Sequence, residues 1–286
     1  MAKEKKFSKL TCAILGILVI LLIVAGIAFF TATGSPVTKA FLNIFTGETQ
    51  VDHGKGYLPA KDGQELALND KVKTLPESEA AVVLQESVII NLEPETEILI
   101  KDLAMEHIKV TQNTGTTWNK FTGLTGVEGL SIETPTTVAT VRGTFFGVKM
   151  DQIIVGEGNV EVTYQGEKYN LKEGQKAVIK DGKLTIEEQT PEDKAEIIAQ
   201  MQKTIKSLKT LRTREVDKHP VLAGQMKKRY QITDEMITEH LEKADRGEYD
   251  LNEVIQKSPV KIASVYKIKE FTEKIIEINK KIQEIK

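Results

Sequence analysis

The spacing of hydrophobic and polar residues changes near residue 190 of this 286-residue chain. Before that point, short apolar runs alternate with polar positions at a period of two, as at Val160, Val162 and Tyr164. This period is typical of a β-strand with one face in water. Turn dipeptides separate the runs, and they are Asp62-Gly63, Asn69-Asp70, Gln165-Gly166 and Asp181-Gly182. The pattern predicts a mainly β fold of short strands, as a β-sandwich, a roll or a short β-solenoid, and does not choose among these.

After residue 190, apolar residues recur at spacings of three and four, which predicts a C-terminal α-helical region. Thr190 and Pro191 form a helix start signal, because a Thr hydroxyl caps the first turn and Pro suits its first position. A second helix is expected from Thr233 to about Arg246, and a last one from Ser258-Pro259 onward. The last helix carries apolar residues in helical register: Ile262, Val265, Ile268, Phe271, Ile275, Ile278, Ile282 and Ile285. This predicts a coiled-coil-like hairpin or a small bundle, packed within one protomer or joining protomers into a homo-oligomer.

The segment Leu10 to Phe30 predicts one N-terminal transmembrane helix. It contains no charged residue, and as a helix it would be about 31 Å long, close to the ~30 Å hydrocarbon thickness of a bilayer. The basic residues before it are Lys3, Lys5, Lys6 and Lys9, which predicts a cytoplasmic N-terminus and an extracytoplasmic remainder. A cleaved signal peptide is the alternative, but its apolar core would span only about 7–15 residues.

These patterns divide the chain into five segments. They are a cytoplasmic tail (1–9), the transmembrane helix (10–30), a linker (31–46), a β domain (47–189) and an α-helical domain (190–286). Cys12 is the single cysteine and lies in the predicted span, so the exported part cannot form an internal disulfide. Membrane lipid is therefore an expected partner of Leu10 to Phe30.

Charge and side-chain chemistry favour neither nucleic-acid binding nor catalysis. Residues 31–190 carry 15 basic and 23 acidic residues, whereas phosphate backbones require a basic face. The histidines, His53, His107, His219 and His240, lack the spacing of a metal site. The nucleophile-elbow, P-loop and zinc-protease motifs are missing, so we expect no enzyme activity, no cofactor and no metal. Glu93, Glu95 and Glu97 alternate along a predicted strand and are expected to form a charged edge.

The segment Thr134 to Val148 (TPTTVATVRGTFFGV) begins a series of three motifs. It is followed by a VGEGNVEV segment and then by an LKEGQKAVI segment. The series resembles the FecR-like family, β-rich domains of microbial cell envelopes named after a ferric-citrate signalling regulator. The matching residues are Thr134, Pro135, Ala139, Val141, Arg142, Gly143, Thr144 and Phe146, then Glu157, Gly158, Val160 and Val162, and finally Leu171, Gly174 and Gln175. The resemblance extends back to about Gly47.

Four residues in or near these motifs allow more specific expectations. Gly143 is expected to hold a bulge or a positive φ angle, and Phe146 to fill the core. Arg142 is expected to pair with a carboxylate of its own domain, because the motif looks structural, and the alternative is an acidic partner chain or an anionic ligand. Trp118, the single tryptophan, is expected in the core rather than in a ligand-stacking role.

The resemblance implies a signalling protein whose exported β domain senses another protein. Relatives of this kind also hold a sigma factor with a cytoplasmic segment, and a tail of about nine residues is too short for that role. We therefore expect a non-catalytic envelope sensor or adaptor that binds another envelope protein or a ligand. The alternative, from a different class, is a structural protein that tethers a surface polymer or assembly to the membrane.

Overall fold

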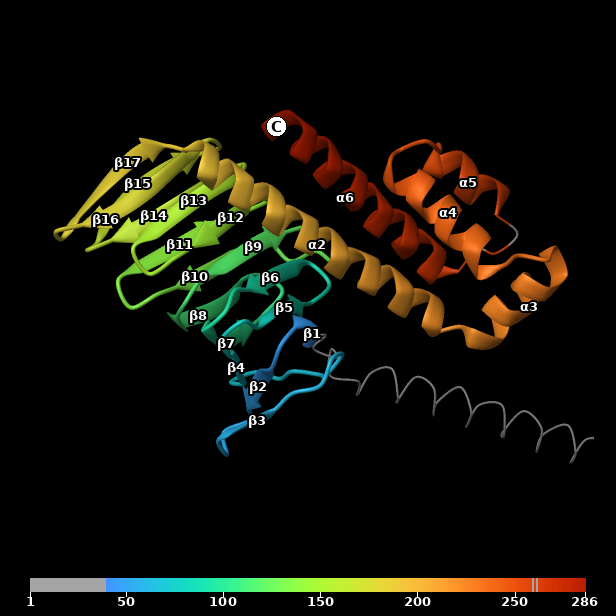
Figure 1. The fold of residues 1–286 in the computed structure, drawn as a ribbon, viewed down its shortest axis with the longest axis horizontal. Coiled ribbons are helices and arrows are strands. Elements are labelled where there is room, and N and C mark those ends of the chain that lie inside the picture. The colour runs from blue at the N-terminus through green and yellow to red at the C-terminus, as the bar shows by residue number, and fades with distance from the viewer. Residues whose placement is uncertain (1–39, 259, 261) are drawn as a thin grey trace, which may run out of the picture. The chain divides into compact units, whose positions relative to one another are not determined.

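The computed structural model describes residues 40–258, 260 and 262–286, and Lys39–Lys286 form one compact unit. Two sheets build its β part (Figure 1). The strands of sheet A, in spatial order, are β1 (Ala40–Thr46), β5 (Glu79–Leu84), β6 (Val88–Leu92), β9 (Thr117–Phe121), β12 (Phe145–Val148), β13 (Gln152–Glu157), β16 (Gln175–Lys180) and β17 (Lys183–Glu188). Those of sheet B are β15 (Glu167–Lys172), β14 (Asn159–Tyr164), β11 (Thr137–Val141), β10 (Leu130–Glu133), β8 (Ile108–Thr114), β7 (Glu97–Leu103), β4 (Lys71–Thr74), β2 (Thr49–Asp52) and β3 (Tyr57–Pro59).

The chain builds both sheets together by crossing repeatedly between them. After β4 in sheet B, it places β5 and β6 in sheet A, β7 and β8 in sheet B, and β9 in sheet A. The alternation continues with β10–β11, β12–β13, β14–β15 and β16–β17. Among the named strands, β8 and β10 pair in parallel and all other pairs are antiparallel. The predicted hairpin turns at Gln165-Gly166 and Asp181-Gly182 are confirmed, because all four residues adopt positive φ angles.

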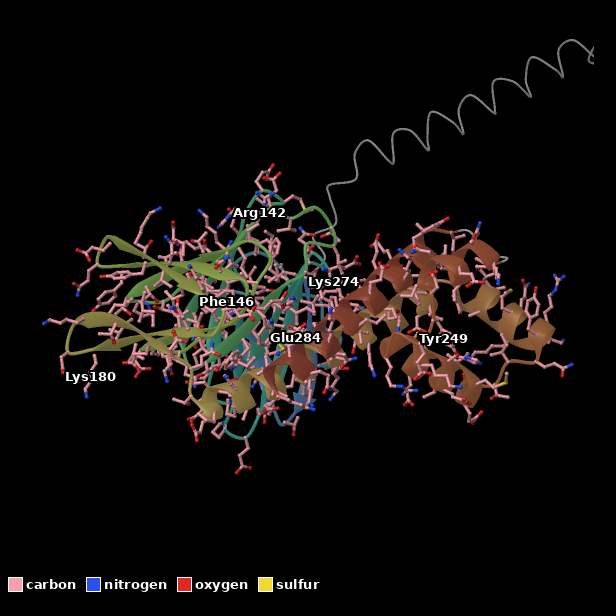
Figure 2. The ribbon with its side chains drawn as sticks, turned by 90° about the horizontal axis from the view of Figure 1, so that it is seen from above. Arg142, Phe146, Lys180, Tyr249, Lys274 and Glu284 are labelled. Carbon is pink, nitrogen blue, oxygen red and sulfur yellow. The ribbon has the colours of Figure 1, made fainter. Side chains whose placement is uncertain are left out.

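The main hydrophobic core lies between the two sheets. It is built from inward positions of both, such as Leu42, Val82 and Ile90 of sheet A and Ile98, Val110 and Ile132 of sheet B. Phe146 is fully buried in this core, as expected, and Figure 2 shows it inside the β part. The mainly β fold with C-terminal helices is thus confirmed, in the form of a two-sheet sandwich.

The C-terminal helices are α2 (Pro191–Asp217), α3 (Pro220–Tyr230), α4 (Asp234–Asp245), α5 (Leu251–Lys257) and α6 (Ala263–Ile285). The α2 start agrees with the sequence, because Thr190 and Asp193 form a capping box. α2 and α6 lie side by side (Figure 1). The buried Arg212 of α2 ties the bundle together, since its Nη2 lies 3.1 Å from Asp245 Oδ2 of α4 and its Nη1 lies 3.1 Å from Thr272 Oγ1 of α6.

A second hydrophobic cluster joins the helices to the outer face of sheet A. Sheet A contributes Phe41, Ala81, Val83, Ile89, Trp118, Phe145 and Ile154. The helices contribute Ile197, Met201, Ile205, Leu208 and Leu211 of α2 and Phe271, Ile275, Ile278 and Ile282 of α6. Trp118 is fully buried here, stacked on Phe145 at a centroid distance of 5.8 Å, so its expected core role is confirmed.

Three expectations from the sequence need correction. Residues 40–46 of the predicted linker form β1, because Phe41 and Leu42 enter the two clusters on opposite faces of sheet A. The three glutamates at 93, 95 and 97 do not form a sheet edge: they lie at the β6–β7 corner and at the start of β7, which has neighbours on both sides. Ser258 ends α5, and α6 begins at Ala263.

The predicted tail and transmembrane helix lie outside the described residues, as do Cys12 and the linker up to residue 39. In the part of the chain that the structure describes, no helix is long and apolar enough to span a membrane.

Candidate binding site at the corners of the sandwich

The motif residues Gly143, Gly158 and Gly174 occupy three successive corners where the chain crosses between the sheets. Gly143 joins β11 to β12, Gly158 joins β13 to β14, and Gly174 joins β15 to β16. All three have positive φ angles, of +73°, +79° and +85°. Such angles are costly for residues with a Cβ atom, so glycine is favoured at each corner. The expectation of a positive φ at Gly143 is therefore confirmed.

The three corners contact one another. A Cβ atom on Gly158 would lie 2.9 Å from Thr144 Cγ2 and 3.0 Å from the Gly143 carbonyl oxygen. The backbone N–H of Glu173 donates to Gly158 O at 2.9 Å, and Gly174 N donates to Val155 O at 3.2 Å. The spacing of the motifs along the chain therefore reflects one row of stacked corners at one end of the sandwich.

Other motif residues support this row. Glu157 forms an ion pair with the buried Lys120 of β9, with 2.6 Å between Oε2 and Nζ. Gln175 Oε1 accepts a hydrogen bond from Lys172 N at 3.0 Å, which closes the β15–β16 turn. Thr134 and Pro135 lie elsewhere, because they form the β10–β11 turn at the opposite end of β11. In that turn Thr134 Oγ1 accepts a hydrogen bond from Thr137 N at 2.9 Å.

Arg142 directly precedes the corner residue Gly143, and Figure 2 shows it at the outer boundary of the β part. Its side chain is exposed, and no described residue forms a hydrogen bond or an ion pair with it. The expected pairing with a carboxylate of its own domain is therefore wrong for the described residues, because Arg142 at this corner extends into solvent. An unpaired guanidinium keeps all five N–H donors free for another molecule.

A shallow polar hollow of about 450 Å³ adjoins Arg142 on the outer side of sheet B. Its lining includes His107, Glu128, Thr140, Arg142, Glu161 and Asn170. Its floor is held by a hydrogen-bonded series, in which His107 Nε2 lies 2.7 Å from Ser131 Oγ and Ser131 Oγ lies 3.1 Å from Thr140 Oγ1. We therefore take this hollow, with Arg142 as its free cation, as the candidate binding site.

The sequence did not identify the other lining residues. His107, Thr140, Glu161 and Asn170 come from β8 and its approach, β11, β14 and β15, which are neighbours only after the strands have paired. The parallel β8–β10 pairing places His107 near Ser131. No local sequence pattern predicts this pairing. The period-two pattern predicts that Glu161 lies on the solvent-exposed face of its strand, but it does not place this residue in the hollow.

The corner strands also contact the start of α2. A Cβ on Gly156 of β13 would lie 2.9 Å from Ile197 Cγ2, so the backbone of β13 approaches the helix closely. Lys176 Nζ of β16 lies 2.7 Å from Asp193 Oδ2. Burial raises the pKa of Asp193, but the hydrogen bonds from Lys176 and Thr190 outweigh it and hold that pKa below its ordinary value. The helical part is thus fixed directly to the strands that form the motif corners.

Hydrogen bonds between polar side chains extend the contact between sheet A and α2 further along the helix. Asn91 Nδ2 donates to Thr204 Oγ1 at 3.1 Å, and Glu93 Oε1 accepts from Gln200 Nε2 at 2.8 Å and from Trp118 Nε1 at 3.3 Å. Burial, and then the nearby carboxylate of Glu196, raise the pKa of Glu93. Among the described residues, no group of three or more His, Cys, Asp and Glu side chains is placed to hold a metal ion.

Comparisons with known proteins agree with the motifs. Residues 70–164 match the family model described as FecR protein. Two solved structures of a "putative anti-sigma factor" from Parabacteroides distasonis, at 2.50 and 1.65 Å resolution, each show 15% identity and a TM-score of 0.38. Each match covers 42% of this chain and 59% of the other, so the chain spans about three fifths of those proteins. A search of curated proteins found no match. Residues 70–164 therefore match a FecR domain, and this range contains the first two motif corners, Gly143 and Gly158, with the strands around them.

Proposed function

We propose that this chain is a non-catalytic, single-pass membrane protein whose exported FecR domain is an envelope sensor or adaptor. The N-terminus lies in the cytoplasm, the segment Leu10 to Phe30 crosses the bilayer, and the remainder lies outside. The domain acts by binding another envelope protein or a ligand. The family match supports a signalling role, because the FecR family is a family of regulators.

The observation that carries the proposal is the exposed, unpaired Arg142 beside the polar hollow. An ion pair within the domain would make this arginine a structural residue, whereas a free guanidinium next to amide, hydroxyl and carboxylate groups suits a polar partner. Strand pairing of Val141 and the contact between Gly143 and Gly158 fix the backbone on the two sides of Arg142, so its position is held without consuming the hydrogen-bond donors of its side chain.

Site-specific photo-crosslinking in the producing cells tests this proposal. A photoreactive residue at Asn170, in the hollow, is compared with one at Lys183, on the exposed β17. We expect Asn170 to capture a discrete protein and Lys183 to give background. Arg142→Ala should weaken the capture about tenfold, since a hydrogen bond to a charged group contributes ~1.5–3 kcal/mol.

The same experiment separates the two functions. A protein adduct that depends on Arg142 supports the sensor or adaptor, whereas an adduct with wall or surface polymer supports the structural tether. Equal yields from Asn170 and Lys183 would remove the hollow as the binding site. The melting temperature of Arg142→Ala should be unchanged, because the side chain is exposed and unpaired.

A further inference from the structure

A second concavity lies in the helical part, between α4, α5 and α6, away from the sheets. Figure 1 shows α4 and α5 beside α6, and Figure 2 places Tyr249, at the entry to α5, in this part of the molecule. The cavity measures about 470 Å³. Its apolar lining is Leu241, Ala244, Leu251, Val254, Ile255, Val265 and Ile268.

The size and lining of this cavity indicate a ligand site rather than loose packing. The cavity is open to solvent on one side, since Val254 in its lining is half-exposed, and exposed apolar concavities mark interaction or ligand sites. Pockets for small ligands measure about 300–1,000 Å³ and are mostly apolar, with a few polar groups that fix orientation. The cavity between α4, α5 and α6 fits this description, whereas the hollow at Arg142 is shallow and polar.

The polar residues of the lining indicate the charge of the ligand. The lining contains Lys269 and His240 but no aspartate or glutamate, although the chain as a whole has 41 acidic residues. His240 Nδ1 lies 2.6 Å from Tyr249 Oη, so these two side chains are held together at the cavity. Lys269 Nζ lies 2.9 Å from Glu273 Oε1, one turn along α6, which leaves it two further N–H donors.

We propose that this cavity binds a single-chain aliphatic carboxylate, that is, a free fatty acid. The acyl chain occupies the space between Leu241, Val254 and Val265, and the carboxylate pairs with Lys269. An aliphatic chain suits the apolar lining because each CH₂ group that it buries contributes about 0.8 kcal/mol to the free energy of binding. A carboxylate can form an ion pair with Lys269, the only lysine in the lining. This inference is independent of the role proposed for the FecR domain.

Equilibrium displacement of a fluorescent fatty acid tests the ligand class. The test uses Lys39–Lys286, which forms one compact unit by itself. We expect 11-(dansylamino)undecanoic acid to bind and decanoate to displace it, with 1-decanol about tenfold weaker because it lacks the charge. Phosphatidylglycerol vesicles should not bind the protein. Equal displacement by decanol, no probe binding, or binding to the vesicles instead would overturn the proposal.

Two pairs of variants locate the site. Leu241→Trp fills the cavity and should abolish probe binding, whereas Val221→Trp, on the exposed face of α3, should leave it unchanged. Lys269→Gln should weaken decanoate binding about tenfold without changing decanol binding, and Glu273→Gln should not weaken either. Undiminished binding by a folded Leu241→Trp variant would refute the assignment.

Photolabelling of the unaltered protein does not depend on the folding of any variant. A diazirine-bearing fatty acid should label peptides of α4, α5 and α6, and an excess of decanoate should prevent the labelling. Labelling confined to the sheets, or labelling that decanoate does not compete, would place the fatty acid elsewhere and overturn the inference.

Discussion

The two sheets of the sandwich differ in how many of their faces are buried. In β6 of sheet A all five residues, Val88–Leu92, are buried, and in β12 all four are. In β11 and β14 of sheet B, buried residues alternate with half-exposed or exposed ones. The strands β1, β5, β6, β9, β12 and β13 of sheet A are enclosed between sheet B and the helices, whereas sheet B presents one face to solvent.

This difference shows that the helical part completes the burial of these strands of sheet A. The outer face of sheet A carries large side chains such as Trp118 and Phe145, and α2 and α6 remove them from water. The outer face of sheet B needs no cover and is free to carry the polar hollow at Arg142. One sheet thus supports the helices, and the other presents the hollow that we propose as the binding site.

Removal of the helices should produce the largest effect. The sequence predicts a domain boundary near residue 190, and a monomeric fragment 40–190. The fragment exposes six large apolar side chains of sheet A, whose burial contributes on the order of 10 kcal/mol as an upper bound. We therefore expect fragment 40–190 to unfold or self-associate, in contrast to 40–286. Analytical ultracentrifugation and circular dichroism measure this, and a folded, monomeric short fragment would restore the two-domain interpretation.

A matched pair of valines compares the outer faces of the two sheets. Val83 of sheet A is fully buried under the helices, whereas Val138 of sheet B is half-exposed. Val83→Ala should lower the free energy of unfolding by about 2 kcal/mol, and Val138→Ala by less than about 0.5 kcal/mol. Urea unfolding of 40–286 provides both values. Similar losses would mean that the helices do not shield sheet A in solution.

Alanine substitution should reduce the free energy of unfolding by different amounts at Gly143 and Gly158, although both glycines have positive φ angles. Gly143 has open space around its missing Cβ, so Gly143→Ala should cost about 1 kcal/mol from backbone conformation alone. Gly158→Ala adds the contact with Thr144 and the Gly143 carbonyl, so its cost should be larger, about 2 kcal/mol or more. Melting curves rank the two variants. The reverse order would contradict the stacking of the corners.

The smallest expected effect concerns the pH dependence of the sheet A–α2 contact. Burial raises the pKa of Glu93 in the folded state, so the folded protein holds this proton more tightly than the unfolded chain. The contribution of Glu93 to stability therefore decreases as the pH rises from about 4.5 through the raised pKa. Glu93→Gln keeps an acceptor for Gln200 and should remove this decrease. Melting temperatures between pH 4 and 8 measure the difference, and parallel profiles would exclude the effect.

Local sequence patterns predicted the turns and helix starts well. Gln165-Gly166 and Thr190-Pro191 were identified because turn chemistry and capping depend on residues a few positions apart. The long C-terminal helix was also anticipated, but its start was placed at Ser258 instead of Ala263. The helices α3 and α5 were missed, since α5 has only seven residues and neither carries a buried residue.

The sequence by itself determined the β and helical regions, the positive φ angle of Gly143 and the burial of Trp118, because these follow from periodicity, backbone freedom and side-chain size. Only the tertiary structure decided which face of sheet A the helices cover, that Arg142 lacks a partner among the described residues, and which strands line its hollow. Those properties depend on the pairing of strands far apart in the chain, such as β8 with β10, and no local spacing of residues records such a pairing.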